Sequence, residues 1–269
     1  MSDLFALEDR VAVVTGGSGA LGRAMALGLA DAGARVAVVA RRREGVDTVA
    51  TEMRRRGADA LALEADVLSS GELAAARDAV LERWGRVDVL VNAAGGNRPE
   101  ATLSDGQDVF DLPLDAFRAV VDLNLTGTWL ACQAFGTAMG ERGSIVNISS
   151  MAAQRALTRV GGYAAAKAAV ESLTRWLAVE LAQRHGGGLR VNAIAPGFVI
   201  GEQNRSLLLD EHGRPTERGR TIIEHTPAGR FGEAGELVGT LLWLCGDGAS
   251  FVTGVVVNVD GGFGAFSGV

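Results

Sequence analysis

The chain has 269 residues, of which 48% are hydrophobic and 22% charged, which suits one well-buried α/β domain and is unlike a disordered chain. A formal net charge of −6 and a pI near 5.2 argue against nucleic acid or an anionic membrane surface as the main partner. No apolar stretch approaches the roughly 18 residues of a membrane span, Met1–Arg10 lacks the apolar core of a signal peptide, and the two cysteines suit a reduced, cytoplasmic setting.

Strands and helices alternate along the chain, which predicts a Rossmann-type, doubly wound parallel sheet of about seven strands with helices on both faces. No repeat, low-complexity tract or linker divides the sequence, so we expect residues 1–269 to form a single domain. The expected strands are Val11–Thr15, Arg35–Ala40, Ala60–Glu64, Val87–Val91, Ser144–Ile148, Leu189–Ile194 and Val255–Val259.

A glycine-rich turn follows the first expected strand. Gly17, Gly19 and Gly22 fit the pattern G-x-G-x-x-G, and an apolar helical pattern then runs to Ala32. In this context glycines let the backbone approach a pyrophosphate at the amino terminus of a helix. A tight turn without a ligand is the alternative, because the motif alone is weakly specific.

A second motif surrounds the expected strand Ser144–Ile148. Tyr163 and Lys167 are four residues apart on a predicted helix, so they lie on one face. A phenol has an ordinary pKa near ~10, and a nearby ammonium favours the phenolate and lowers that pKa toward the working pH. Ser150 stands at the carboxyl end of the strand, where its hydroxyl can hold a carbonyl oxygen for the phenol to protonate. The pair alone is common on helices.

Together with Asn92-Ala93-Ala94-Gly95 and Asn124, these motifs resemble the short-chain dehydrogenase/reductase family in its single-domain form, over nearly the whole chain. The resemblance implies the strand order 3-2-1-4-5-6-7 and reversible hydride transfer between a nicotinamide and a ketone or secondary alcohol. It also implies that Tyr163 is the acid, that Lys167 binds the nicotinamide ribose, and that Asn124 kinks its helix and links Lys167 through water to solvent. No metal is required.

The family also implies which residues contact the cofactor. Asp66 would meet the adenine amino group, although a helix N-cap acid is the alternative. The family's usual threonine is replaced by Gly201, which leaves backbone near Val199 to hold the carboxamide. The expected contacts are Gly16, Gly17, Gly19, Leu21, Gly22, Arg41, Asp66, Val67, Asn92, Ala93, Gly95, Tyr163, Lys167, Pro196, Gly197 and Val199.

The end of the second strand bears on the choice of nicotinamide cofactor. Ala40 occupies the position where NAD-binding relatives place an acid for the ribose 2′-hydroxyl, and Arg41 follows it. A neutral residue followed by arginine suits a 2′-phosphate, so we expect NADP(H) to be preferred, with NAD(H) possible. The alternative is that Arg41–Arg43 form a solvated loop. The turn supplies no second basic residue at Gly17 or Ser18, which argues against NADP(H).

Two polar loops, near residues 96–113 and 197–230, are expected to form the wall and lid of the substrate pocket. Arginine and amide side chains suit a keto or hydroxy sugar acid better than a steroid or long acyl chain. Asn97, Arg155, Asn204 and Arg205 are the candidate substrate residues. Within the family, the segments Ala94–Asn97, Glu202–Arg205, Thr221–Gly232 and Asp260–Val269 resemble the D-mannonate oxidoreductase (fructuronate reductase) branch.

Two other functions fit the same residues. A reductase of 3-oxoacyl thioesters, other sugars or polyols would share the catalytic residues and differ in the loops. A non-catalytic nicotinamide-binding sensor is the second, and the intact set of catalytic residues argues against it. Family members are usually tetramers built through long helices and the C-terminal strand, so we expect a homotetramer.

Overall fold

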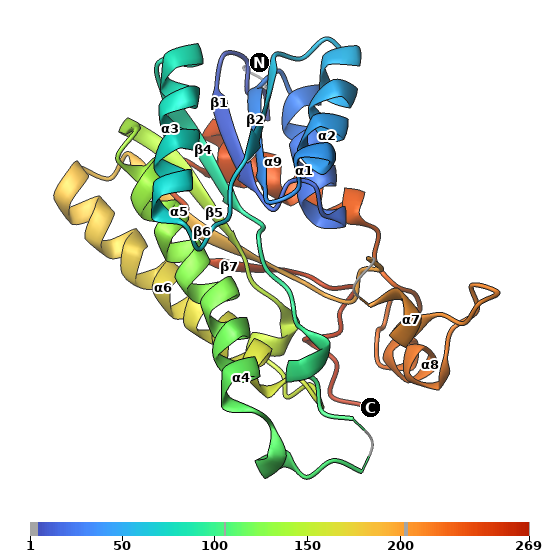
Figure 1. The fold of residues 1–269 in the computed structure, drawn as a ribbon. Helices are drawn as coiled ribbons and strands as arrows, with labels where there is room; N and C mark the ends of the chain where they lie inside the picture. The colour runs from blue at the N-terminus through green and yellow to red at the C-terminus, as the bar shows by residue number, and fades with distance from the viewer. Residues whose placement is uncertain (1–4, 105, 202–203, 269) are drawn as a thin grey trace.

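The computed structural model describes residues 5–104, 106–201 and 204–268. Its centre is a seven-stranded parallel sheet in the order β3-β2-β1-β4-β5-β6-β7, which confirms the expected topology (Figure 1). The strands are β1 (Val11–Thr15), β2 (Arg35–Ala40), β3 (Ala60–Glu64), β4 (Val87–Asn92), β5 (Met139–Ile148), β6 (Leu189–Pro196) and β7 (Val256–Val259).

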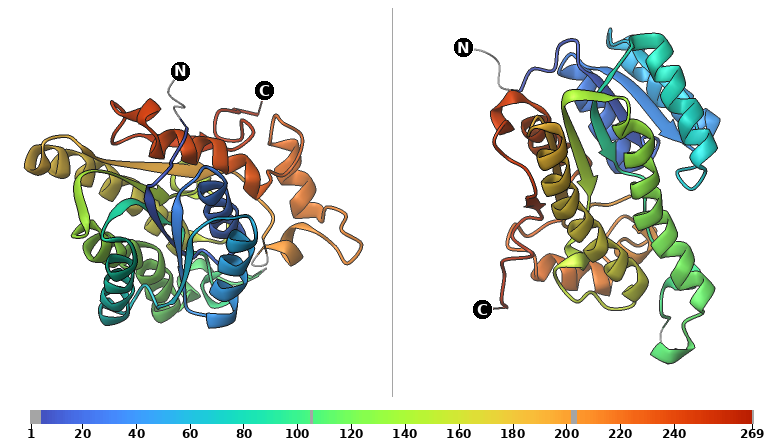
Figure 2. Two further views of the ribbon diagram at one scale, coloured as in Figure 1. Left: turned by 90° about the horizontal axis from the view of Figure 1, so that it is seen from above. Right: turned by 90° about the vertical axis from the view of Figure 1, so that its left-hand side faces the viewer.

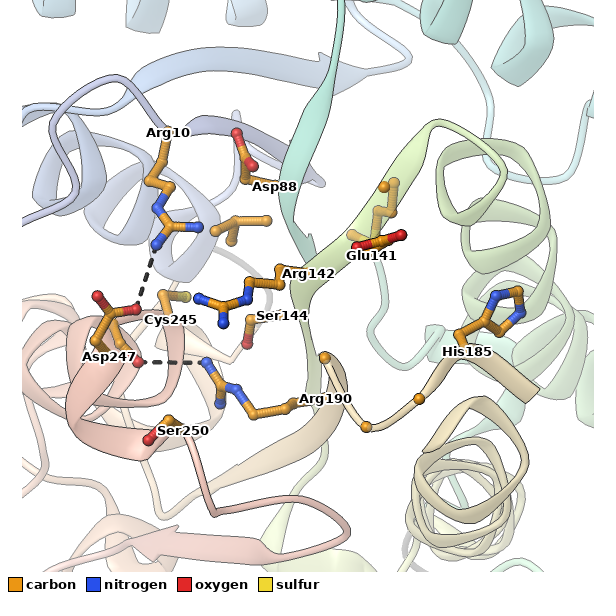
Figure 3. Close-up of a pocket in the computed structure, with 18 residues that line it drawn as sticks. Arg10, Asp88, Glu141, Arg142, Ser144, His185, Arg190, Cys245, Asp247 and Ser250 are labelled. Atoms are coloured by element: carbon orange, nitrogen blue, oxygen red, sulfur yellow. Dashed lines mark hydrogen bonds and ion pairs between the residues drawn. The ribbon is translucent and has the colours of Figure 1, made fainter. Parts of the chain in front are cut away.

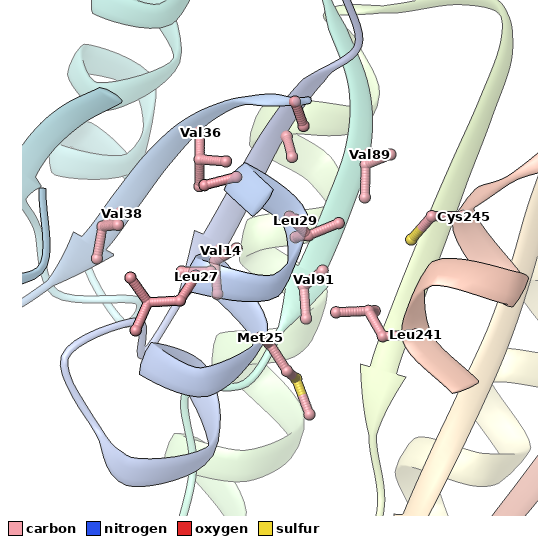
Figure 4. Close-up of a cluster of buried hydrophobic side chains, with 14 of the residues drawn as sticks. Val14, Met25, Leu27, Leu29, Val36, Val38, Val89, Val91, Leu241 and Cys245 are labelled. Atoms are coloured by element: carbon pink, nitrogen blue, oxygen red, sulfur yellow. The ribbon is translucent and has the colours of Figure 1, made fainter. Parts of the chain in front are cut away.

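Helices cover both faces of the sheet (Figure 2). One face packs against α1 (Ala20–Asp31), α2 (Arg43–Arg55) and α9 (Val238–Cys245). The other face packs against α3 (Ser70–Trp84), α5 (Gly127–Gly136) and α6 (Gly161–His185). Successive residues of each strand therefore point into two separate cores. Both faces of the strands are apolar, as buried parallel strands require. Figure 4 shows the first core, in which Met25 and Leu29 of α1 lie beside Val14 and Val91.

The sequence located five strand starts correctly and β7 within one residue, but β5 begins five residues earlier than predicted. Its first half includes Gly140–Arg142, which are exposed, so this segment lacks the apolar pattern that marks a buried strand. Its register against β4 also shifts between Val87 and Val89, which separates the short pairing at Met139 from the regular pairing that starts at Ser144.

The irregular elements gather where the strands end, at the lower side of Figure 1. The segment after β4 contains the short helical turns η1 (Pro99–Ala101) and η2 (Val109–Asp111), then α4 (Leu114–Val121) and the π-helical turn η3 (Asp122–Thr126). The segment after β6 contains α7 (Arg205–Leu208) and α8 (Glu217–Glu224). The remaining short turns are η4 (Met151–Ala153), η5 (Ala234–Leu237) and η6 (Asp247–Ala249). Glu202, Gln203 and Val269 of the segments that resemble the mannonate branch lie outside the described residues.

Within residues 5–104, 106–201 and 204–268, no helix is both long enough and apolar enough to cross a membrane. The same part of the chain contains no group of three or more histidine, cysteine, aspartate or glutamate side chains arranged to hold a metal ion.

Candidate active site

Tyr163 and Lys167 occupy the first turns of α6, one turn apart, beside the carboxyl end of β5. They are the only tyrosine and the only lysine of the chain. The Lys167 ammonium lies 5.6 Å from the centroid of the phenol ring and donates a hydrogen bond to the carbonyl oxygen of Ile148 at 2.7 Å. Ser150 lies two residues beyond the end of β5 and caps η4, where its hydroxyl accepts from Ala152 N at 3.1 Å. The structure thus brings Ser150, Tyr163 and Lys167 together.

The two ionisable groups of this cluster have shifted pKa values, and one direction differs from our expectation. Burial raises the pKa of Tyr163 above its ordinary value, while hydrogen bonding to the Ser150 hydroxyl opposes part of that rise. Burial also lowers the pKa of Lys167 to about 8. The predicted lowering of the phenol pKa is therefore wrong for the protein alone, because the ammonium is directed at the carbonyl of Ile148 and desolvation dominates.

Asn124 connects this cluster to the loop after β4. It is fully buried in the π-helical turn between α4 and α5, where the helix departs from regular geometry as expected. Its amide donates to Gly96 O and Val120 O, both at 2.8 Å, and its Oδ1 accepts from Gly96 N at 3.0 Å. The side chain therefore locks the backbone at Gly96 in place.

Because Gly95 has no side chain, it leaves room for the side chains of Asn124 and Lys167. A Cβ atom at this position would lie 2.6 Å from Asn124 Oδ1 and 3.1 Å from Lys167 Nζ, so no larger residue fits without displacing one of them. Asn124 and Lys167 thus line the same small space at the end of β4, which is the arrangement that a proton relay between them requires.

The glycine-rich turn forms a cradle at the amino end of α1. A Cβ atom at Gly22 would lie 2.3 Å from Gly16 O, and one at Gly16 would lie 2.5 Å from Ala94 N. Gly16 also has a positive φ of 65°. Gly19 is the N-cap of α1 and no acid occupies the first turn of this helix, so its amide groups and dipole remain available to an anion. Leu21 lies in that first turn and packs partly buried against the core.

The end of β2 presents exposed arginines and also a carboxylate. The side chains of Arg41 and Arg42 make no hydrogen bond or ion pair within the described ranges, whereas Arg43 Nε donates to Asp47 at 2.8 Å. Glu64, the last residue of β3, pairs with Ala40 across the β2–β3 register. A carboxylate from β3 thus lies beside the position that lacks an acid on β2.

Two expected cofactor residues also serve the local fold. Asp66 Oδ1 accepts from Leu68 N at 3.0 Å, which closes the turn after β3, and the adjacent Val67 packs near Gly127. The Asn92 side chain is buried beneath the cleft and donates to Asn147 Oδ1 at 2.9 Å and to Cys132 Sγ at 3.2 Å. Its Oδ1 has no partner among the described residues. The side chain of Asn92 is therefore used in contacts within the protein.

The strand β6 ends at Pro196, two residues beyond the predicted end at Ile194, and hydrogen bonds fix the backbone that follows. Gly197 N donates to Val259 O at 3.0 Å, and Val199 forms an isolated bridge with Gly232. The candidate substrate residue Asn204 donates to Val199 O at 2.9 Å and accepts from Gly201 N at 2.8 Å. Its amide group therefore holds the turn before the lid.

The other three candidate substrate residues differ in exposure and in their hydrogen bonds. Arg155 is exposed, and its guanidinium donates to Gly264 O, 2.9 Å from Nε, so it ties the C-terminal segment to the loop after β5. Arg205 is exposed at the start of α7, and its side chain makes no hydrogen bond or ion pair within the described ranges. Asn97 donates to Thr102 Oγ1 at 2.6 Å, while its buried Oδ1 has no partner in those ranges.

One polar residue near the reacting groups was missed. Glu171 lies on α6, one turn beyond Lys167, and is only 7% exposed. It accepts hydrogen bonds from Ser149 Oγ at 2.9 Å and from Gln154 Nε2 at 3.0 Å. Its spacing was a usable signal, because Tyr163, Lys167 and Glu171 recur every four residues on one face of the helix.

A cavity of about 880 Å³ opens at the opposite end of the sheet, where the strands begin (Figure 3). Its charged groups serve local structure. Arg190 donates to Leu244 O at 2.8 Å, at the carboxyl end of α9, and Arg10 pairs with Asp247 at 3.3 Å. None of the predicted site residues lines this cavity, so we do not assign the reaction to it.

Similarity to known proteins identifies the family of this chain. The family model described as enoyl-(acyl carrier protein) reductase matches residues 17–264. The uncharacterized oxidoreductase UxuB of Bacillus subtilis is 44% identical over 274 residues, which cover 98% of each chain. The chain belongs to the short-chain dehydrogenase/reductase family.

Two solved structures of this family share the fold over 98% of both chains. A Haemophilus influenzae protein with bound NAD, provisionally named D-mannonate oxidoreductase, has a TM-score of 0.91 at 40% identity. A gluconate 5-dehydrogenase of Burkholderia cenocepacia, in complex with NADP and tartrate, has a TM-score of 0.88 at 33% identity. The chain is therefore an oxidoreductase that acts on alcohols or carbonyls with a nicotinamide cofactor, and these relatives do not determine which cofactor it prefers.

Proposed function

We propose that this short-chain dehydrogenase/reductase interconverts a keto sugar acid and its secondary alcohol, of the D-fructuronate/D-mannonate type, with NADP(H) as the preferred cofactor. The observation that carries the proposal is the grouping of Ser150, Tyr163, Lys167 and Asn124 at the carboxyl ends of β4 and β5. An acid, an oxygen-holding hydroxyl and a buried amine in one cluster suit reduction of a carbonyl.

The residues present fit a nicotinamide dinucleotide. The turn at the amino end of α1 has no side chain at Gly16, Gly17, Gly19 and Gly22, so its backbone would admit the pyrophosphate. It is also too tight for a Cβ atom at Gly22, which would meet Gly16 O. Asp66 has one carboxylate oxygen, Oδ2, that is left for the adenine amino group, since Oδ1 already accepts from Leu68. The nicotinamide would lie near Gly95 and the Pro196–Val199 turn. When bound, it supplies hydride for reduction or accepts hydride for oxidation.

Side chains of this protein carry out the proton transfer. Tyr163 donates its phenolic proton to the carbonyl oxygen, and Ser150 holds that oxygen by a hydrogen bond. Lys167 stabilises the phenolate that remains and would hold the nicotinamide ribose. Because Lys167 and Asn124 line the same space at Gly95, a water between them would return a proton to the site. In the oxidative direction each transfer reverses.

The loops support a small polyhydroxylated acid as the substrate. The wall, residues 96–113, places the unpartnered Asn97 Oδ1 next to the backbone that Asn124 fixes. The lid, within residues 197–230, presents the exposed Arg205, whose guanidinium suits a carboxylate. Arg155 and Asn204 hold the loop backbone and shape the pocket through it. Relatives whose names specify mannonate and gluconate agree with this class.

The preference for NADP(H) rests on Arg41 and its neighbour Arg42, whose side chains are unpaired among the described residues. Glu64 beside Ala40 opposes it, since a carboxylate repels a 2′-phosphate. We expect Arg41→Ala to raise the KM for NADPH about tenfold and to leave the KM for NADH within twofold. A wild-type enzyme that uses NADH more efficiently than NADPH would overturn the preference.

The same proposal extends to assembly and location. Exposed apolar side chains lie on α6, at Trp176 (52% exposed) and Val179, and before β7, at Phe251 and Val255. Such surfaces suit burial between copies of the chain, so we propose that the single domain, residues 1–269, forms a homotetramer in the cytoplasm. Sedimentation would contradict this if the protein were monomeric at micromolar concentration.

A substrate panel tests the proposed activity. The oxidation of NADPH is followed with D-fructuronate, a neutral keto sugar, a ketose derived from a polyol, and a 3-oxoacyl thioester. We expect the highest kcat/KM with D-fructuronate and at least tenfold less with the neutral keto sugar, because it lacks the carboxylate. Highest efficiency with the thioester would replace the sugar acid with the 3-oxoacyl alternative, and no turnover with any compound would favour a sensor.

A further inference from the structure

Glu171 is the buried acid on α6 that the proposed chemistry leaves unused. It is 7% exposed, and Arg175, the one cation that pairs with it among the described residues, stays 3.9 Å away. Two donors reach its Oε1 atom instead, the Ser149 hydroxyl at 2.9 Å and the Gln154 amide at 3.0 Å. A buried carboxylate is costly unless such charge-assisted hydrogen bonds hold it.

The two donors bracket the segment that contains Ser150. Ser149 precedes it directly, and its backbone N–H is already tied to Ile194 O at 2.7 Å on β6. Gln154 ends the short turn η4, whose first amides are capped by Ser150 itself. Gln154 also exchanges two hydrogen bonds with Asn258 of β7, at 3.1 and 3.0 Å. Glu171 therefore fixes both ends of the Ser150 turn.

Helix α6 holds the Ser150 turn through Glu171 and also carries the proton donor Tyr163. Tyr163, Lys167 and Glu171 follow one another at four-residue intervals along α6, so the carboxylate lies on the same face as the phenol. A bond from Glu171 to the Ser150 turn thus links the oxygen-holding hydroxyl to the proton donor through one rigid element. Without that bond, the turn keeps its links to β6 and β7 and the hydrogen bond between Ser150 and Tyr163, but it loses the carboxylate that holds both of its ends to α6.

We infer that Glu171 is a positioning residue, which sets the distance between the Ser150 hydroxyl and the Tyr163 phenol through its bonds to Ser149 and Gln154. The inference rests on the proposed function, since it gives Ser150 and Tyr163 their roles. Because it acts through Ser150, the effect of losing Glu171 depends on whether the serine hydroxyl is present.

A double-mutant cycle tests this dependence. Glu171→Ala, Ser150→Ala and the double variant are compared with wild type for kcat, KM and cofactor Kd. We expect Glu171→Ala to lower kcat about tenfold or more, with cofactor Kd within twofold. In the Ser150→Ala background the same change should lower kcat less than twofold, because the hydroxyl that it positions is absent. A merely structural role would lower kcat equally in both backgrounds.

Controls separate the possible failures. Glu171→Gln keeps an acceptor oxygen and should recover most of kcat, and Glu180→Ala on the same helix should leave kcat unchanged. If Glu171→Ala does not fold, Ser149→Ala takes its place in the cycle, with the same expectation of non-additivity. Additive losses in the cycle would overturn the inference alone. Wild-type activity of Ser150→Ala would instead overturn the proposed function.

Discussion

The floor of the site, formed by Asn124 and Lys167, and the loops that surround it are built differently. On the floor, Asn124 and Lys167 are buried, and the Asn124 amide and the Lys167 ammonium bond to backbone carbonyls of regular or nearly regular elements. In the surrounding loops, Arg205 is exposed on a four-residue helix, and Arg155 bonds to a carbonyl more than a hundred residues away in sequence. The floor is fixed by strands and helices, whereas the surrounding loops are fixed by contacts with one another.

This difference separates what the site does from what it acts on. Proton transfer needs atoms held within a fraction of an ångström, which rigid elements provide. Recognition of a substrate tolerates looser contacts, so the surrounding loops can vary while the floor stays the same. Substitutions in the floor should therefore reduce kcat strongly, and substitutions in the surrounding loops should change KM modestly.

The largest effect is expected for Tyr163→Phe. Loss of the phenolic oxygen removes the proton donor, so kcat should fall about a thousandfold while the cofactor Kd stays within twofold. Stopped-flow turnover and fluorescence titration of the cofactor measure the two quantities. A kcat within tenfold of wild type would show that another group supplies the proton.

The next largest effect is expected for Gly95→Ala. The new methyl group would lie 2.6 Å from Asn124 Oδ1 and 3.1 Å from Lys167 Nζ, so one of them must move. We expect kcat to fall about a hundredfold, as displacements of this size do at reacting groups. Gly71→Ala is the matched control, because a Cβ atom there meets no atom within 4 Å. Equal kcat values for the two variants would contradict the shared space.

A third effect concerns the dependence of folding stability on pH. The pKa of Lys167 is lowered in the folded state to about 8, so below that pH the fold carries the full cost of a buried ammonium. Between about pH 8 and pH 10.5 the unfolded chain binds more protons, and this contribution raises the free energy of unfolding with pH, by about 3 kcal/mol in all. Lys167→Met should lack that rise.

The comparison of these two proteins isolates the lysine, because it is the only one in the chain. The buried thiols of Cys132 and Cys245 have pKa values raised to about 12, and they lower stability above the ordinary thiol range equally in both. Chemical denaturation at pH 7 and pH 10 measures the difference. A gap between wild type and variant that does not shrink with pH would contradict the lowered pKa.

The smallest effect is expected in the lid. Arg205→Ala should raise the KM for a keto sugar acid about fivefold and leave kcat unchanged, because an exposed guanidinium contributes only modestly. Arg220→Ala, elsewhere in the lid, should change neither value. An unchanged KM in Arg205→Ala would remove this residue from the substrate site.

The difference between regular elements and loops also explains which features the sequence could predict. Periodic segments predicted β1, β2 and β3 to the residue and put Tyr163 and Lys167 on one helix face, because apolar spacing reports burial directly. The hydrogen bonds of Asn204 to Val199 and Gly201, and of Arg155 to Gly264, depend on how loops fold back, which no local pattern encodes. The direction in which the Tyr163 pKa shifts also required the structure. Burial raises this pKa, and the Lys167 ammonium, which donates to Ile148 O, does not offset the rise.

We expect Tyr163 to become a usable acid when the cofactor completes the site. Because the chain contains one tyrosine, carbon-13 labelling at Cζ gives a single NMR signal that reports the phenol directly. We predict a titration midpoint above the ordinary value of a phenol in the protein alone, a fall of that midpoint when NADP⁺ binds, and no such fall in Lys167→Met. A midpoint that cofactor binding leaves unchanged in the wild type would show that the cofactor and Lys167 do not activate this phenol.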